Sequence, residues 1–396
     1  MVIGGSGWTG SFLVSQLVKL AQTPNSDMRV HSVDIRLPPS TLKKLHEGET
    51  SFELCDITDK ESTMELIARL NPRTIFHTAS IVDLRQYPSP SIQKVNVDGT
   101  HNILEALSQE SLRKYSRFLV YTSSIDVVST RQGAKGANES TPTPTAPSNH
   151  YKRTKIIAEK AVVAKNGLHG LYTCAVRPGH IFGPADLLLP LSRHPIALGP
   201  ASATMSFVYV ENVARAHLLA ALALIRETKR IDKGEGGEHE GHVLAGTALF
   251  VNDFDTNFTD MYRTLGGHPP VLLRVHVWLA YTVVLLAEVL ETIFFHLFGV
   301  QIIGHPVTGI THAMLEATGY LTSSAERAGR VIGYWGGGES AEGSLCKDGM
   351  SSNGLVGRQE AMRRTQVFVQ SGELPVECYE AKAINLSHYM DMHKNV

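Results

Sequence analysis

The sequence has almost no net charge and few cysteines, and both shortages exclude classes of protein. Its 37 Lys and Arg against 38 Asp and Glu give a net charge of -1, so nothing points to nucleic acid or to a polyanionic substrate. The cysteines Cys55, Cys174, Cys346 and Cys378 are scattered without a C-x-x-C pair. This argues against a disulfide framework or a metal site and suits a reducing compartment.

The sequence also lacks an apolar run long enough to cross a bilayer, which takes about 20 residues. The most apolar segment is 271–300, where 13 residues from Val275 to Ala287 contain no Asp, Glu, Lys or Arg before Glu288 and Glu291 interrupt. Two interpretations remain open: a buried helix of a substrate-binding region, or a helix in a membrane interface. No secretory signal precedes the first motif.

The first motif present is a glycine-rich turn between two apolar stretches. Residues 4–10 read GGSGWTG, after the apolar Met1-Val2-Ile3 and before the amphipathic run 12–20. Strand, glycine turn and helix in that order let backbone N–H groups approach a pyrophosphate, because glycine has no Cβ. The spacing differs from G-x-G-x-x-G, and the short first strand leaves open a truncation at the N-terminus.

An acid ends the second predicted strand, 29–34. Asp34 lies 24 residues after Gly10, where a carboxylate can accept the ribose hydroxyls of an adenosine and repel a 2′-phosphate. This favours NAD. The nearby Arg36 could accommodate that phosphate, so NADP stays open.

Strands and helices then alternate. We expect strands at 52–56, 74–79, 117–124 and 172–177, with helices over 61–70 and from residue 95. This order predicts an α/β fold with a doubly wound parallel sheet, whose ligands bind at the carboxyl ends of the strands. Ser124 would lie there, with Ser123 as its competitor, and could orient a substrate oxygen.

Tyr151 and Lys155 lie four residues apart in a helix expected over 148–163, so both leave the same face. A phenol with a pKa of about 10 is a poor base at neutral pH. An ammonium one turn away, and a bound positively charged nicotinamide, would favour the phenolate. Tyr151 is therefore the predicted general acid/base.

With Arg177-Pro178, Phe182-Gly183-Pro184 and the run 207–214 (FVYVENVA), these motifs resemble the extended short-chain dehydrogenases. Within these they are most similar to the 3β-hydroxysteroid dehydrogenase branch, particularly its decarboxylating sterol-4α-carboxylate 3-dehydrogenases. The resemblance covers roughly residues 1–335.

The resemblance implies a role for each matching residue. Gly4, Gly7 and Gly10 would hold the pyrophosphate, Asp34 the ribose, and Asp56 would lie near the adenine. Ser124, Tyr151 and Lys155 would form the catalytic triad, with Tyr151 and Lys155 also contacting the dinucleotide. Asn96 would be structural or support a proton relay.

The expected reaction is the NAD-dependent oxidation of the 3β-hydroxyl of a sterol-like substrate, with decarboxylation if it carries a 4α-carboxylate. The alternatives are a 3β-hydroxysteroid dehydrogenase/isomerase, a dehydrogenase of polycyclic terpenoids, and a non-catalytic dinucleotide-binding regulator. The resemblance implies the cytoplasmic side of the endoplasmic reticulum membrane or a lipid droplet, and otherwise the cytoplasm. A membrane-surface contact and a homodimer stay open.

The expected organisation has four parts. A Rossmann-type NAD-binding domain covers 1–184, with 207–250 returning to it. A smaller substrate-binding region takes 185–206 and 251–334. A flexible Gly/Ser-rich linker follows at 335–356, and a C-terminal helix and tail at 357–396. Residues 228–242 are expected to form a long surface loop.

Overall fold

The computed structural model describes most of the chain. The described residues are 1–24, 26–38, 50–82, 90–110, 115–130, 132–186, 188–189, 196–232, 243–269, 271–298, 319–336 and 355–371. The expected tail after residue 371, most of the linker, and Cys346 and Cys378 lie outside them. Cys55 and Cys174 are buried free thiols.

A seven-stranded parallel sheet forms the centre of the molecule, in the order β11-β7-β5-β4-β1-β2-β3. Its strands read as apolar runs because both faces are covered: Val120, Val176 and Leu249 are fully buried. The predicted doubly wound parallel sheet is therefore confirmed. The strands are β1 (Val2–Ile3), β2 (Val30–Asp34), β3 (Thr50–Leu54), β4 (Thr74–His77), β5 (Phe118–Thr122), β7 (Tyr172–Pro178) and β11 (Thr247–Val251).

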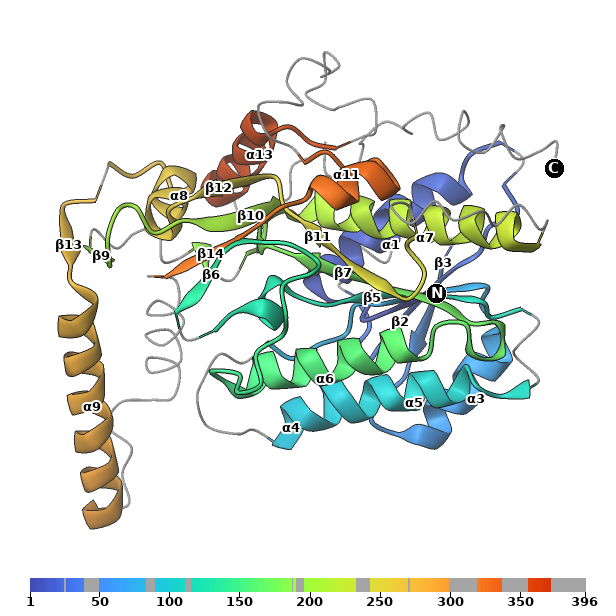
Figure 1. Cartoon of the computed structure of the whole chain (residues 1–396), viewed down its shortest axis with the longest axis horizontal. Helices are drawn as coiled ribbons and strands as arrows, with labels where there is room; N and C mark the ends of the chain where they lie inside the picture. Colours follow the sequence, from blue (N-terminus) through green and yellow to red (C-terminus); the bar gives the residue numbers. More distant parts are fainter. Residues whose placement is uncertain are drawn as a thin grey trace.

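Helices cover both faces of this sheet (Figure 1). On one face lie α1 (Trp8–Ala21) and α7 (Val210–Asp232), which pack against each other. On the other lie α3 (Lys60–Leu70), α5 (Gly99–Ala106) and α6 (His150–Ala164). α5 continues α4 (Pro90–Gln93) and a π-helical turn over Lys94–Asp98, so this helical stretch begins earlier than predicted.

A second, five-stranded sheet lies beside the first in the order β12-β10-β14-β6, with β8 paired to β10. The strand β6 lies between β5 and α6, where the sequence predicted no strand. Its sequence, GAKGA, has none of the β-branched or aromatic residues typical of strands. The bounds are β6 (Gly133–Ala137), β8 (His180–Phe182), β10 (Met205–Tyr209), β12 (Phe254–Thr256) and β14 (Tyr320–Ser323).

Smaller elements complete this side of the molecule. β9 (Ile196–Leu198) pairs in parallel with β13 (Leu273–Val275), and α8 (Phe258–Leu265) follows β12. α11 (Glu326–Ile332) follows β14. Part of the loop predicted at 228–242 is helical, because α7 continues to Asp232, and residues 233–242 lie outside the described part.

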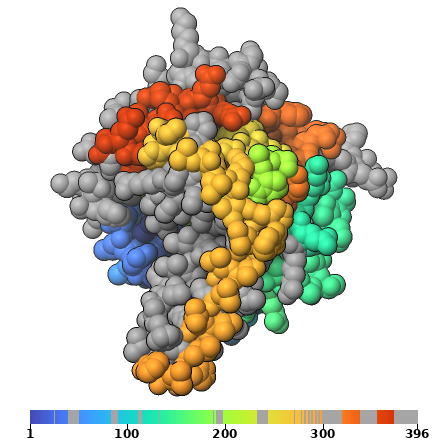
Figure 2. Space-filling view, turned by 90° about the vertical axis from the view of Figure 1, so that its left-hand side faces the viewer, coloured from blue at the N-terminus to red at the C-terminus, as the bar shows by residue number. Residues whose placement is uncertain are grey.

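α9 (Val277–Phe298) projects from the body of the molecule, as both overall views show (Figures 1 and 2). Its described leucine, valine and isoleucine side chains are exposed, so the interpretation of 271–300 as a buried helix is wrong for these residues. The side chains of Glu288 and Glu291 lie outside the described part. None of the described helices combines the length and apolarity that a bilayer crossing requires.

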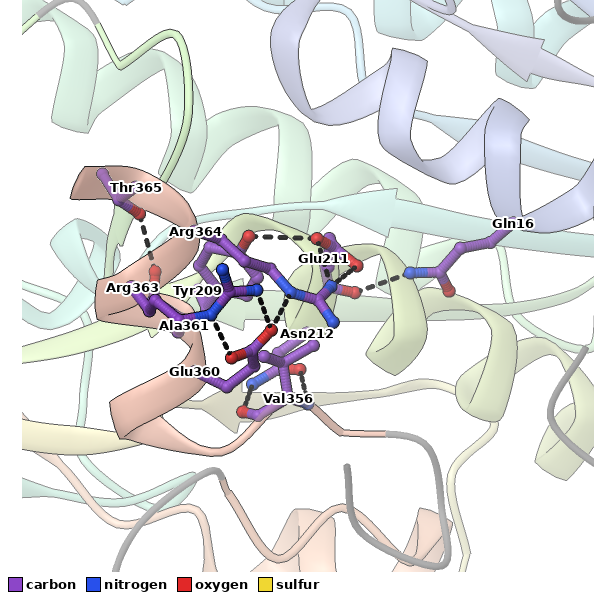
Figure 3. Close-up of polar contacts among 10 residues, drawn as sticks. All are labelled: Gln16, Tyr209, Glu211, Asn212, Val356, Glu360, Ala361, Arg363, Arg364 and Thr365. Carbon is purple, nitrogen blue, oxygen red and sulfur yellow. Dashed lines mark hydrogen bonds and ion pairs between the residues drawn. The ribbon is translucent and has the colours of Figure 1, made fainter. Parts of the chain in front are cut away.

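The last helix of the described residues, α13 (Arg358–Ser371), docks on the body through buried polar contacts (Figure 3). Arg364 donates to both carboxylate oxygens of Glu211, at 3.0 and 3.1 Å. Just before the helix, Val356 exchanges two hydrogen bonds with the Asn212 side chain. Leu355 and Val356, at the end of the expected flexible linker, are buried.

Candidate active site

The glycine turn joins β1 to α1 at the carboxyl end of β1, next to the central strand β4. Gly4 has a φ of +87°, and a Cβ there would lie 2.5 Å from the Ala79 nitrogen. A Cβ on Gly10 would lie 2.0 Å from the Gly4 oxygen. Both positions therefore require glycine, and the turn leaves open the space that a pyrophosphate needs at a helix N-terminus. The helix begins at Trp8, four residues earlier than predicted, so Gly10 lies inside it.

Asp34 lies beside this turn, as predicted for a ribose-binding acid. Its carboxylate accepts the Ser6 backbone N–H at 3.1 Å, which ties the end of β2 to the glycine turn. The Arg36 side chain is exposed two residues further on. Asp56 follows β3 at the same edge of the sheet, because the neighbouring Cys55 N–H donates to the Asp34 backbone carbonyl. The Asp56 carboxylate accepts the Thr58 backbone N–H. Both acids thus lie where the adenosine of a dinucleotide would be held.

The two neighbouring serines after β5 point to different partners. Ser123 donates to the buried carboxylate of Glu159 at 2.5 Å, and Glu159 also forms a two-point ion pair with Arg177. Ser124 instead faces Tyr151, whose pKa its hydroxyl lowers through a hydrogen bond. Of the two serines considered, Ser124 is the one placed beside the tyrosine.

Tyr151 is buried in the first turn of α6, a helix that Asn149 caps by accepting the Lys152 N–H. Burial raises the pKa of Tyr151, the negative charge of Asp126 raises it further, and the Ser124 hydrogen bond acts against both. A lowered pKa was expected from Lys155, so in the protein alone this expectation is wrong. The other group expected to favour the Tyr151 phenolate is a positively charged nicotinamide, which would act only when the dinucleotide is bound.

Lys155 is buried beneath Tyr151 on the same helix and points at β5. Its ammonium donates to the Thr122 carbonyl at 2.5 Å and lies 4.5 Å from the centre of the Tyr121 ring. Burial lowers the pKa of Lys155 to about 7, and the carboxylate of Glu159 opposes this. The shift in the pKa of Tyr151 comes from burial, Asp126 and Ser124, and Lys155 is not among its causes.

Asn96 sits in the π-helical turn and is saturated with protein partners. Its amide nitrogen donates to the Ile81 carbonyl at 2.9 Å and to the Thr154 hydroxyl at 3.1 Å. Its oxygen accepts from the Ile81 N–H at 2.8 Å and from the Ser80 hydroxyl. These bonds hold the loop after β4 against α6. They therefore support a structural role for Asn96 rather than a role in a proton relay.

Sequence reasoning missed two charged residues of this site. Asp126 lies in the short 3-10 turn after Ser124 and accepts the Ser124 hydroxyl at 3.1 Å. Lys152, next to Tyr151, is buried with its ammonium 3.9 Å from Asp126. The S-x-D spacing of Ser124 and Asp126 was the available signal, since an acid two residues after a serine can accept its hydroxyl.

A third missed contact joins the glycine turn to the segment that follows β8. The indole N–H of Trp8 donates to the Pro184 carbonyl at 2.7 Å. The tryptophan within the glycine motif therefore fixes the start of α1 against the Phe182-Gly183-Pro184 motif. No cluster of metal-ligating side chains occurs among the described residues.

Together these residues form a site at the carboxyl ends of the central strands, with a glycine cradle on one side and a buried Ser-Tyr-Lys group on the other. A hydroxyl pair of this kind can exchange a proton with an alcohol or carbonyl oxygen. The cradle fits a dinucleotide, because side chains at Gly4 and Gly10 would fill it. The arrangement defines a dinucleotide-dependent oxidoreductase site.

Solved structures with the same fold include NAD complexes. The dTDP-glucose 4,6-dehydratase of Bacillus anthracis, solved with NAD, is 16% identical with a TM-score of 0.61, over 96% of this chain and 98% of that one. The UDP-glucose 4-epimerase of Thermus thermophilus, also solved with NAD, is 17% identical with a TM-score of 0.58, over 94% and 99%. At these identities the likeness shows the fold alone, a Rossmann-type architecture.

The family is narrower than the fold. Residues 1–265 match the model of the 3-beta hydroxysteroid dehydrogenase/isomerase family, and the chain belongs to this family. It is an oxidoreductase of the short-chain dehydrogenase type that acts on CH–OH groups with a nicotinamide dinucleotide. The resemblance inferred from the sequence motifs, the enzyme class and the cofactor class are thereby confirmed.

The named relatives include both decarboxylating sterol-4-alpha-carboxylate dehydrogenases and 3-beta-hydroxysteroid dehydrogenases. The decarboxylating sterol-4-alpha-carboxylate 3-dehydrogenase of Candida albicans is 31% identical over 297 residues, covering 72% of this chain and 79% of the relative. The 3-beta-hydroxysteroid dehydrogenase of Mycolicibacterium neoaurum is 31% identical over 268 residues, covering 64% and 65%. Both relatives have the same identity over the residues they match, although the first match is longer.

Proposed function

We propose that the protein oxidises the 3β-hydroxyl of a sterol-like substrate with NAD, and that the substrate carries a 4α-carboxylate. The observation that carries the proposal is the hydrogen bond between the Ser124 and Tyr151 side chains, at the edge of the parallel sheet where β1 ends in the glycine turn. Asp34 next to the cradle favours NAD over NADP, because a carboxylate repels a 2′-phosphate. The similarity to a named sterol-4-alpha-carboxylate dehydrogenase supports the substrate class.

Each residue has a defined task in this reaction. Tyr151, as phenolate, removes the hydroxyl proton of the substrate, and Ser124 orients the substrate oxygen. Lys155, fixed by the Thr122 carbonyl, supplies positive charge and a donor for the ribose. The dinucleotide, when bound, supplies the hydride acceptor.

Decarboxylation needs no further protein base. Oxidation of a 3-hydroxyl next to a 4-carboxylate produces a β-keto acid. Such an acid loses carbon dioxide through an enolate, and the enolate is then protonated on carbon. The three residues assigned to the oxidation therefore suffice for the whole reaction.

A substrate panel tests this proposal. Purified protein is given NAD with a 4α-carboxysterol, a 3β-hydroxysteroid without the carboxylate, and a polycyclic terpenoid alcohol, and NADH and carbon dioxide are measured. We expect NADH with the carboxysterol, accompanied by equimolar carbon dioxide. Turnover of the simple steroid alone would make the protein a 3β-hydroxysteroid dehydrogenase. NADH from none of the three would contradict the proposal and favour a non-catalytic dinucleotide binder.

The same proposal assigns a membrane surface to the exposed stripe on α9, on the cytoplasmic face of the endoplasmic reticulum or a lipid droplet. The stripe consists of Leu279, Val283, Leu286, Leu290, Ile293 and Leu297, which are 45% to 68% exposed. Their spacing of four and three residues puts them on one side of the helix. A large exposed apolar patch marks an interaction site, and a sterol is delivered from lipid.

Two further features favour lipid as the occupant of this stripe. The helix projects beyond the body of the molecule, so that its side can lie along a surface (Figure 2). Trp278, which is 62% exposed, stands at its first turn, and tryptophan is enriched at membrane interfaces.

Sedimentation with phosphatidylcholine vesicles tests this assignment. The wild type should sediment with vesicles, and the double variant L286E/L290E should stay in solution. The matched control is Leu168→Glu, which changes a leucine that is 49% exposed outside α9. The opposite result is a wild type that does not sediment with vesicles but forms dimers, which L286E/L290E abolishes. In that case the stripe binds a second copy and the membrane assignment is wrong.

A further inference from the structure

Two charged side chains lie behind the proposed catalytic hydroxyls, and none of the steps described so far uses them. Asp126 is in the 3-10 turn over Ile125–Val128, and Lys152 is on α6 next to Tyr151. The Lys152 side chain is 3% exposed and that of Asp126 20%. A buried lysine is costly unless its charge is paired and its hydrogens are accepted.

Lys152 has those partners. Its ammonium donates to the Ser148 hydroxyl at 3.0 Å and to the Ser129 hydroxyl at 3.2 Å, and it lies 3.9 Å from the Asp126 carboxylate. The lysine therefore holds the turn after β5 against the start of α6. It also places a positive charge directly behind the carboxylate.

Asp126 in turn fixes the hydrogen bonding of Ser124. The serine has a single hydroxyl proton, which it donates to the Asp126 carboxylate at 3.1 Å. The same hydroxyl oxygen accepts the Asp126 backbone N–H, also at 3.1 Å. Both bonds set the rotamer of Ser124, and rotation about its Cβ–Oγ bond can turn the one hydroxyl proton from Asp126 to Tyr151 or to a substrate oxygen.

We infer that Asp126 and Lys152 are a positioning pair for the proposed reaction: Asp126 holds the Ser124 side chain by two hydrogen bonds and places a negative charge behind it, and Lys152 holds the Asp126 turn and balances that charge. The inference rests on the proposed roles of Ser124 and Tyr151. According to this inference, the charges of these two residues determine the pH range in which Tyr151 can act as a base.

The charged surroundings of Tyr151 support this assignment. Asp126 is the charge that raises the pKa of Tyr151, after burial. Tyr121 of β5 also faces it, and the pKa of that phenol is raised by burial. On the other elements packed against α6, Arg177 of β7 is paired with Glu159, and Lys94 and Asp98 of the π-helical turn are exposed. On α5, Glu105 is paired with Lys60 and His101 is exposed. Asp126 is thus the carboxylate placed to act on Tyr151.

The sign of the effect follows from the charges. Oxidation needs the phenolate, so the rate rises with pH through the pKa of Tyr151 in the complex. Asp126→Asn removes a negative charge and keeps an acceptor for Ser124, so the rise should move to lower pH by roughly one unit. Lys152→Gln removes the compensating positive charge, so the rise should move to higher pH by a similar amount.

The experiment records the pH dependence of kcat for the wild type, D126N, D126E and K152Q with saturating NAD. D126E keeps the charge and should return the profile to that of the wild type. Lys160→Gln is the matched control, because it removes a lysine charge from an exposed position of the same helix. Opposite shifts in D126N and K152Q, with none in K160Q, cannot arise from a structural defect, which would lower kcat at every pH. Unshifted profiles in both variants would overturn the inference.

A second readout separates this inference from the proposed function. The phenolate absorbance of each variant, minus that of the same variant carrying Y151F, is titrated with NAD bound and no substrate. If no alcohol is oxidised but the Tyr151 titration shifts in opposite directions in D126N and K152Q, the proposed function fails and the inference stands. If alcohol is oxidised and the titrations coincide, the inference fails alone. If both fail, neither assignment survives.

Discussion

Arg364 on α13 and Glu211 at the start of α7 form a buried ion pair, with side chains that are 3% and 6% exposed. The Glu211 carboxylate also accepts the Tyr209 hydroxyl at 3.0 Å, and its backbone carbonyl accepts the Gln16 side chain of α1 at 2.8 Å. Figure 3 shows these residues meeting from three parts of the chain. The C-terminal helix is thereby tied to the helix that follows the glycine turn.

Breaking this pair should destabilise the whole fold. Arg364→Gln leaves the Glu211 carboxylate buried without its charged partner, which costs about 3 kcal/mol. For a protein of this size we expect Tm to fall by several degrees. Arg363→Gln is the control: its side chain is 48% exposed, and its loss should cost less than about 1 kcal/mol. Equal Tm values for R364Q and R363Q would show that the buried pair contributes nothing.

Gly10→Ala should weaken dinucleotide binding. The new Cβ would lie 2.0 Å from the Gly4 backbone oxygen, so the turn must move away from the geometry that admits a pyrophosphate. We expect NAD affinity, measured by calorimetry, to fall at least about tenfold. Gly136→Ala, where φ is +59° and a Cβ would meet nothing within 4 Å, strains only its own turn and should keep NAD affinity unchanged. Wild-type affinity in G10A would mean that the dinucleotide lies elsewhere.

Asp34→Ser should shift cofactor preference toward NADP. The variant removes the charge that repels a 2′-phosphate and leaves the exposed Arg36 two residues away. We expect kcat/KM for NADP to rise and that for NAD to fall, so that their ratio changes by more than about tenfold. Asp56→Asn, at the end of the neighbouring strand, should leave the ratio unaltered. An unchanged preference in D34S would remove Asp34 from the ribose site.

Acid should destabilise the protein through its buried histidines. Burial lowers the pKa of His77 to about 3, with Lys155 as a second cause, and burial lowers those of His180 and His217 to about 4. The unfolded chain takes up these protons near pH 6.5 while the folded one does not. Stability is therefore full above about pH 6.5 and falls with decreasing pH toward about 4.

The size of this effect can be measured by urea unfolding. Each such histidine contributes roughly 1.4 kcal/mol per pH unit within that window. Asp186, whose pKa burial raises to about 6, opposes part of the loss. We expect the urea midpoint to fall clearly between about pH 7.5 and pH 5, and less steeply in His217→Asn. A midpoint independent of pH would contradict the buried neutral histidines.

The order of strands and the positions of Gly4, Asp34 and Tyr151 could be predicted because each depends on local patterns: a glycine turn, a strand end and a helical spacing. β6 could not, since GAKGA becomes a strand only by pairing with β14, nearly 200 residues away in sequence. The exposure of α9 was equally hidden, because apolar periodicity does not say whether a helix face meets protein or another environment.

The electrostatics of the site were the hardest part to predict. Helical spacing placed Lys155 on the face of Tyr151, but the ammonium turns to the Thr122 carbonyl. Asp126 and Lys152 reach the site through a three-dimensional contact between a turn and a helix. A pKa depends on burial and on all neighbouring charges, which a single sequence does not display.

The rate of NADH formation from a 3β-hydroxysterol, compared between the wild type and Tyr151→Phe, tests the central claim most directly. Phenylalanine keeps the ring that α6 buries and removes only the hydroxyl that carries the proton. We predict NADH formation by the wild type and a loss of at least about a thousandfold in kcat for Y151F, with NAD affinity retained. Comparable turnover by the two proteins would contradict the assignment of Tyr151 as the base.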